Sequence, residues 1–98
     1  MFVRVALFRW VDEASDADRA GVSVALGALP DLIDSLRTYR FGADLGMADG
    51  NWDYAVVAEF DDVDGYVAYR DHPTHQAVLR DHILPILRER AAVQYEPS

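Results

Sequence analysis

The chain has 98 residues, 51% of them apolar, which is enough for one compact domain over residues 1–98 and too little for two. Nine basic residues against 17 acidic ones give a net charge of −8, which disfavours binding to nucleic acid or to an anionic membrane surface. All nine basic residues are arginine and cysteine is absent, which excludes Schiff-base lysines, thiolate nucleophiles, disulfides and thiolate metal sites.

The segment Phe2–Val11 is rich in β-branched and aromatic residues and predicts a long strand. Its even residues Arg4, Ala6, Phe8 and Trp10 share one face, and its mostly apolar odd residues share the other, so both faces of the sheet need a cover. Arg4 and Arg9 interrupt the apolar run, which is typical of neither a signal peptide nor a membrane-spanning segment. We therefore expect a cytoplasmic protein.

A helix is predicted to begin near Ser15, because Ser15 suits the N-cap and Asp16 and Asp18 suit the first turn. Its apolar residues recur at three-to-four spacing up to Leu29, and Pro30 is expected to end it. The chain then turns over residues 30–35.

Two strands are predicted next, over Leu36–Leu45 and Trp52–Phe60, separated by turn residues between Gly46 and Gly50. In the second of these strands every even residue is apolar or aromatic, so this face is expected to meet the helices. Tyr54 belongs to that face.

Asp61 and Asp62 can cap a short helix that carries Tyr69, after which Pro73 restarts the chain. A helix is predicted over Pro73–Arg88, with a kink at Pro85, and a short final strand over Val93–Tyr95.

This order of elements predicts an α+β fold, the ferredoxin-like split βαβ pattern, with a four-stranded antiparallel sheet and its helices on one face. The apolar face that the helices leave open predicts a second sheet from a partner subunit, and hence a homodimer closed through the sheet face.

The segment from Tyr69 to His75, Tyr-Arg-Asp-His-Pro-Thr-His, holds the densest cluster of chemically useful side chains. His75, Leu79 and His82 follow at helical spacing, so His75 is expected to point inward with the apolar stripe. An imidazole suits proton transfer at neutral pH, and a phenol can donate to a developing oxyanion. His75 and Tyr69 are therefore a candidate acid–base pair.

Other interpretations stay open at this point. His72 can cap the helix, and His75 can bind a buried carbonyl. A metal site would use both histidines with Asp71 or His82, although this gives few ligands. Arg4, on an apolar strand face, needs a carboxylate or an anionic ligand unless it reaches water, and the Tyr54 hydroxyl needs a partner or a cavity.

Three segments, VRVALFRW, NWDYAVVAEF and above all YRDHPTHQAVLRDHILPIL, resemble the stress-responsive A/B barrel domain, a dimeric α+β barrel family. The resemblance covers nearly the whole chain, and the Tyr-x-x-His-Pro-x-His pattern is its most specific part. It implies a ferredoxin-like subunit that dimerises through its sheet, with a pocket between sheet and helices. Similar members include plant polyketide cyclases that need neither metal nor organic cofactor; others are stress-associated proteins without an established activity.

The resemblance implies that His75 is the base and that Tyr69 assists it. Where the family often has a histidine on the first strand this chain has Arg4, and Tyr54 replaces a pocket-facing histidine of some members. The expected substrate-binding residues are Arg4, Tyr54, Phe8 and His72, without a metal or cofactor.

The favoured function is a cofactor-independent cyclase, lyase or isomerase that acts by acid/base chemistry on a small aromatic or polyketide-like carbonyl compound. A non-catalytic, stress-responsive dimer that binds a ligand and a cofactorless monooxygenase are the alternatives.

Overall fold

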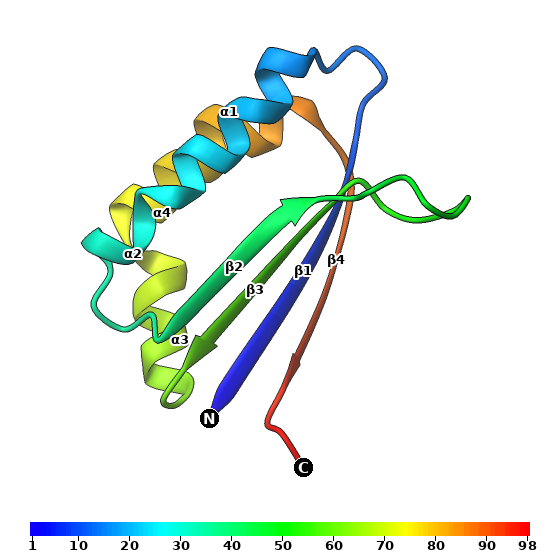
Figure 1. Cartoon of the computed structure of the whole chain (residues 1–98). Helices are drawn as coiled ribbons and strands as arrows, with labels where there is room; N and C mark the ends of the chain where they lie inside the picture. The colour runs from blue at the N-terminus through cyan, green and yellow to red at the C-terminus, as the bar shows by residue number, and fades with distance from the viewer.

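The computed structural model describes residues 1–98 and shows one sheet with all helices on one of its faces (Figure 1). The strands are β1 (Phe2–Trp10), β2 (Thr38–Ala43), β3 (Tyr54–Phe60) and β4 (Leu87–Tyr95). The helices are α1 (Asp16–Gly27), α2 (Leu29–Leu32), α3 (Val63–Asp71) and α4 (Pro73–Val78). After α4, a π-helical turn η1 (Leu79–Ile83) and a 3-10 turn η2 (Leu84–Ile86) lead into β4.

The four strands are antiparallel and lie in the order β2-β3-β1-β4, so the predicted ferredoxin-like fold is confirmed. The register places Arg4 of β1 opposite Ala58 of β3, on the face that the helices cover. Phe8 of β1 is opposite Arg90 of β4 on that same face. The sheet therefore presents two arginines toward the helices.

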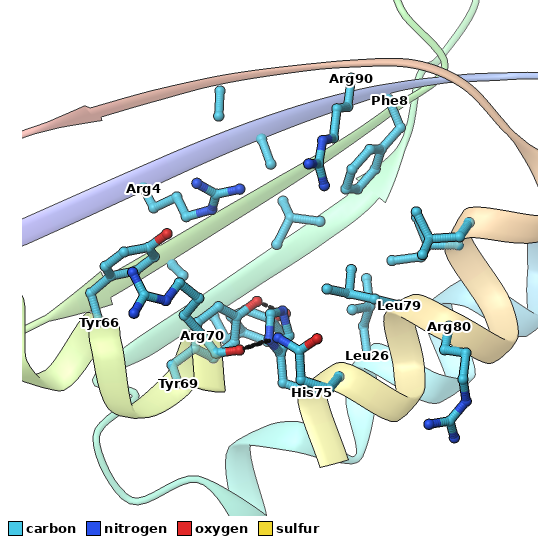
Figure 2. Close-up of a pocket in the computed structure, with 18 of the residues that line it drawn as sticks. Arg4, Phe8, Leu26, Tyr66, Tyr69, Arg70, His75, Leu79, Arg80 and Arg90 are labelled. Atoms are coloured by element: carbon cyan, nitrogen blue, oxygen red, sulfur yellow. Dashed lines mark hydrogen bonds between the residues drawn. The ribbon is translucent and has the colours of Figure 1, made fainter. Parts of the chain in front are cut away.

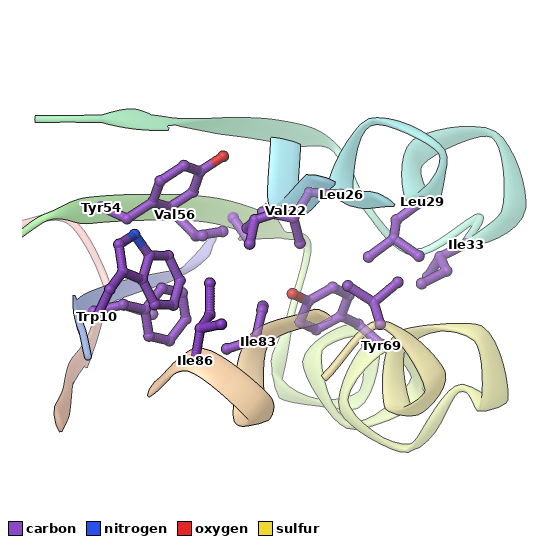
Figure 3. Packing of buried hydrophobic residues seen from close by; sticks show 14 of the residues in the cluster. Trp10, Val22, Leu26, Leu29, Ile33, Tyr54, Val56, Tyr69, Ile83 and Ile86 are labelled. Atoms are coloured by element: carbon purple, nitrogen blue, oxygen red, sulfur yellow. The ribbon is translucent and has the colours of Figure 1, made fainter. Parts of the chain in front are cut away.

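The hydrophobic core fills the space between this face and the helices (Figure 3). The even residues of β3 are all buried, as the alternation predicts. The most deeply buried side chains come from the sheet and from the helices that cover it: Phe60, Leu26, Leu29, Ile83 and Val22. Burial of such side chains is the main term that stabilises a domain without disulfides.

The start of α1 is confirmed, because Ser15 accepts a hydrogen bond from the Asp18 backbone and Asp18 returns one to Ser15. The prediction that residues 30–35 only turn the chain is wrong. Pro30 lies in the first turn of α2, where its missing N–H costs nothing because a helix start leaves that group unpaired.

The predicted strand boundaries need correction. β3 begins at Tyr54 rather than Trp52, because the side chain of Asp53 accepts the Trp10 N–H that another strand residue would otherwise take. β2 spans Thr38–Ala43 and ends before Asp44, whose carboxylate folds back on the Gly46 N–H.

The largest difference from the prediction is the boundary between the last helical turn and β4. The helical run ends at Ile86, not Arg88, and Pro85 lies within η2. β4 is a full edge strand of nine residues rather than a short one around Val93–Tyr95. Its first half carries charged and small residues that show no apolar alternation, because few of its side chains are buried.

The face of the sheet opposite the helices has no cover within the chain (Figure 1). Val5, Leu7 and Val57 lie half-buried there, while Val93 and Tyr95 are exposed. The helices themselves are too short and too polar for any of them to cross a membrane.

Candidate functional site

A cavity of about 690 Å³ lies between the sheet and the α3–α4–η1 layer (Figure 2). Four of the six residues expected at a site from the sequence line it: His75, Tyr69, Arg4 and Phe8. The remaining polar lining was not anticipated and comprises Tyr39, Tyr66, Arg70, Gln76, Arg80 and Arg90.

Tyr54 and His72 do not line this cavity, and each has a structural partner instead. The Tyr54 hydroxyl is 2.6 Å from Ser23 Oγ of α1, and the residue is 3% exposed. His72 is the N-cap of α4, where its Nδ1 accepts the Thr74 N–H at 3.1 Å. The capping interpretation of His72 is thus the one that the geometry supports.

The junction between α3 and α4 fixes the position of His75. Pro73 has no N–H and therefore cannot extend α3, so the chain turns at His72 and starts α4. This leaves the Arg70 carbonyl in the last turn of α3 without a helical partner. The His75 Nδ1 lies 3.0 Å from that oxygen, and the Gln76 amide also donates to it. The backbone carbonyl of Arg70 thereby orients the imidazole of His75.

The hydrogen bond to Arg70 also decides which ring nitrogen of His75 is free. A carbonyl oxygen can only accept, so the neutral ring carries its hydrogen on Nδ1 and its lone pair on Nε2. Nε2 has no hydrogen-bond partner in the protein, and the side chain points from α4 toward the sheet (Figure 2). His75 is 8% exposed, and burial lowers its pKa; the hydrogen bond to the Arg70 carbonyl opposes this shift in part, and the nearby Arg4 charge adds to it. Its imidazole is therefore a neutral base at pH 7.

Tyr69 and Tyr39 form a pair of phenols beside His75. Their hydroxyl oxygens are 2.7 Å apart, and the Tyr69 ring lies 4.1 Å from the His75 ring, centroid to centroid. Burial is the largest cause that raises the pKa of both phenols, so both are protonated at neutral pH. One hydroxyl hydrogen serves the bond between them, which leaves the second free to be donated to a ligand oxygen.

Arg4 and Arg90 bring positive charge to the cavity from the sheet. The Arg4 guanidinium lies 5.7 Å from the centroid of the Tyr66 ring. Arg90 extends from the edge strand β4 (Figure 2). Neither has a carboxylate within ion-pair distance.

Tyr39 and Arg90 were not anticipated because their roles depend on strand pairing. A signal for Tyr39 existed in the sequence, since it shares a strand face with Phe41, but an aromatic residue at such a position is typical of core. For Arg90, the signal was hidden by the misplaced start of β4.

The residues considered for a metal site are not gathered around one point. No group of three histidine, aspartate, glutamate or cysteine side chains in the chain is arranged to hold an ion. His72 is occupied by its capping bond, and Asp71 pairs with Arg70 at 2.9 Å.

Residues 2–97 match the family model of the stress-responsive A/B barrel domain. The chain belongs to this family. No curated protein matches it in sequence.

Solved structures share the fold over most of their length. A dimeric ferredoxin-like protein of Thermobifida fusca is 49% identical, with a TM-score of 0.90, over 96% of this chain and 88% of that one. A protein of Arabidopsis thaliana is 18% identical, with a TM-score of 0.85, over 100% and 96% of the two chains. A hydroxynitrile lyase of Passiflora edulis is 16% identical, with a TM-score of 0.82, over 96% and 91%. The last two similarities show the fold alone.

Proposed function

We propose that this protein is a cofactor-independent enzyme that uses acid/base chemistry on a small aromatic or polyketide-like carbonyl compound. The observation that carries the proposal is the position of His75, which lines a cavity beside the phenol pair Tyr39–Tyr69 and whose Nε2 has no hydrogen-bond partner in the protein. Base and hydrogen-bond donor are thus held together on three different elements. The Passiflora edulis lyase supports the idea that a domain of this fold can hold an enzyme site.

The reaction begins with transfer of a proton from the carbon next to a carbonyl group to His75 Nε2. The electrons of the broken C–H bond form the C=C bond of an enolate, and its oxygen accepts the free hydroxyl hydrogen of the phenol pair. The Arg70 carbonyl keeps its bond from Nδ1–H and stabilises the imidazolium that forms.

Two outcomes balance this first step. In the isomerisation of a β,γ-unsaturated ketone, the enolate is a conjugated dienolate, and the imidazolium returns its proton to the γ carbon as the double bond moves next to the carbonyl group. In a cyclisation, the enolate carbon attacks a second carbonyl carbon, and the proton moves to the new alkoxide.

The rest of the lining suits a flat, largely apolar molecule. Phe8, Leu79 and Ile83 border the cavity together with the Tyr66 ring. Aromatic and aliphatic walls exclude water from a bound ring and favour aromatic stacking.

The proposal is tested by proton exchange into solvent. Aryl methyl ketones such as acetophenone and 4-acetylbenzoate are incubated in D2O, and loss of the methyl signal is followed by proton NMR. We expect the wild type to exceed free imidazole at equal concentration by at least about a hundredfold, the low end for a positioned general base. His75→Gln should fall to background. The matched control is His82→Gln, because His82 does not line the cavity.

Exchange no faster than free imidazole, or full exchange in His75→Gln, would overturn the proposal. Ketone binding without exchange would instead assign a non-catalytic ligand-binding protein. Oxygen uptake with the same compounds, followed with an electrode, would assign the monooxygenase alternative.

We also propose that two copies pack through the open faces of their sheets. Apolar side chains of three strands lie on that face without a helix over them, and the Thermobifida fusca protein is described as dimeric. Light scattering coupled to size-exclusion chromatography should give twice the mass of 11.0 kDa at micromolar concentration. A mass of one chain would refute this arrangement.

A further inference from the structure

The charge of the cavity is opposite to that of the whole molecule. The chain carries a net charge of −8, yet the cavity lining contains no aspartate or glutamate. Four of the nine arginines line it: Arg4, Arg70, Arg80 and Arg90. A concave site of one sign attracts ligands of the other sign.

Two of these arginines are neutralised by neighbours in the sequence. Arg70 pairs with Asp71 and Arg80 pairs with Asp81, each with an N···O distance of 2.9 Å. Arg4 and Arg90 form no ion pair and no hydrogen bond with the protein. The cavity therefore retains two positive charges that no carboxylate of the chain compensates.

Arg4 is the better placed of the two for binding. It is half-buried at the centre of the sheet, whereas Arg90 is exposed on the edge strand. A partly buried guanidinium costs free energy unless an anion accompanies it. The Tyr66 ring centroid lies 5.7 Å from the Arg4 guanidinium, and the guanidinium N–H groups donate no hydrogen bond within the protein.

Arg4 also lies close to the proposed reaction centre. Figure 2 shows its guanidinium on the cavity side of the sheet, facing the layer that holds Tyr69 and His75. Arg4, Tyr69 and His75 all line this one cavity. Arg90 is opposite Phe8, so it lies four residues, or about 13 Å, further along the strands.

We propose that the substrate is a carboxylate anion, whose carboxylate binds Arg4 through paired N–H···O bonds while its carbonyl group faces His75. The planar fork of a guanidinium matches a carboxylate, and charge-assisted bonds of this kind are among the strongest in proteins. Arg90, near the open edge, contributes attraction without a fixed contact. The carbonyl part of this inference rests on the proposed function, and the carboxylate part does not.

The test compares two ligands that differ in charge and little in shape, 4-acetylbenzoate and 4-acetylbenzamide. Their dissociation constants are measured by calorimetry on wild type and on His75→Gln, in which the proposed reaction is blocked. We expect the carboxylate to bind at least about tenfold more tightly than the amide, and the difference to shrink as salt is added.

Substitutions then locate the preference. Arg4→Met keeps the length of the side chain and should abolish the preference, while Arg4→Lys retains the charge but not the fork and should keep part of it. Arg90→Met should cause a smaller loss. Arg19→Met is the control, because Arg19 lies on α1 in the helical layer, away from the open sheet face, and does not line the cavity.

Equal affinity for the two ligands, failure of both to bind at millimolar concentration, or an unchanged preference in Arg4→Met would overturn the inference. If Arg4→Met fails to fold, the preference for the carboxylate over the amide is compared between wild type and Arg4→Lys, and an unchanged preference in Arg4→Lys would overturn the inference. A protein that prefers the carboxylate but exchanges no protons would keep the anion site and reject the proposed enzyme function. Proton exchange of 4-acetylbenzamide as fast as that of 4-acetylbenzoate would keep the proposed enzyme function and reject the anion site.

Discussion

The phenol pair beside His75 offers a quantitative test of the site geometry. Replacing Tyr39 or Tyr69 by phenylalanine removes one of two hydroxyls whose oxygens are 2.7 Å apart. The aromatic ring remains, so packing against the core is nearly unchanged. The hydroxyl that is left behind loses its protein partner while staying largely enclosed, since Tyr69 is 5% exposed.

The magnitude follows from the cost of an unsatisfied buried hydroxyl. A net hydrogen bond contributes about 1 kcal/mol, and an orphaned polar group costs about 1–3 kcal/mol. Because each hydroxyl borders a cavity that water can enter, we expect each single substitution to lower the free energy of unfolding by about 1.5 kcal/mol. The double substitution removes both partners and should cost about the same as either single one. The coupling energy in a double-mutant cycle is then about 1.5 kcal/mol.

Urea unfolding followed by circular dichroism measures all four proteins. The protomer concentration must be the same throughout, because the stability of a dimer depends on it. Additive costs, with a coupling energy within about 0.3 kcal/mol of zero, would show that the hydroxyls do not bond to each other. The proposed donor to the enolate would then have no structural basis.

Three further predictions concern other parts of the molecule. The folded-state pKa of His75 is lowered, so the unfolded chain takes up the proton first, and the free energy of unfolding should fall as pH drops below about 6.5. His75→Gln should show a shallower fall in urea titrations between pH 7 and the folded pKa, and parallel curves would contradict the burial of the ring. Ser15→Ala removes the cap bond to the Asp18 N–H and should cost about 1 kcal/mol in the same assay, whereas no change would reject the capping box. Val57→Asp places a charge at the middle of the open sheet face and should give monomers by light scattering, while a stable dimer would place the interface elsewhere.

The fold was largely predictable because its main signals are local. The apolar alternation of Tyr54–Phe60 and the Ser15 cap each depend on a few adjacent residues, and both are confirmed. The boundaries were less predictable where a side chain of one segment bonds to the backbone of another. Asp53 sets the start of β3, because its side chain accepts the Trp10 N–H, a contact between residues 43 positions apart.

The same distinction between local signals and contacts of distant segments applies to the residues of the candidate site. His75 and Tyr69 could be anticipated because a short helix junction determines their geometry. Tyr39 and Arg90 could not, since strand pairing across the whole chain brings them to the cavity. Tyr54 shares the helix-facing side but lies where α1 supplies Ser23 as a partner, and the sequence alone does not show which part of that side is covered.

Nitrogen-15 NMR of the histidine rings across a pH titration reports directly on the proposed base. We predict that His75 is neutral at pH 7, with hydrogen on Nδ1 and not on Nε2, and with a pKa below about 6.5. Addition of 4-acetylbenzoate should shift the Nε2 signal of His75 and leave that of His82 in place. Hydrogen on Nε2, or a His75 pKa above about 6.5, would contradict its assignment as the base.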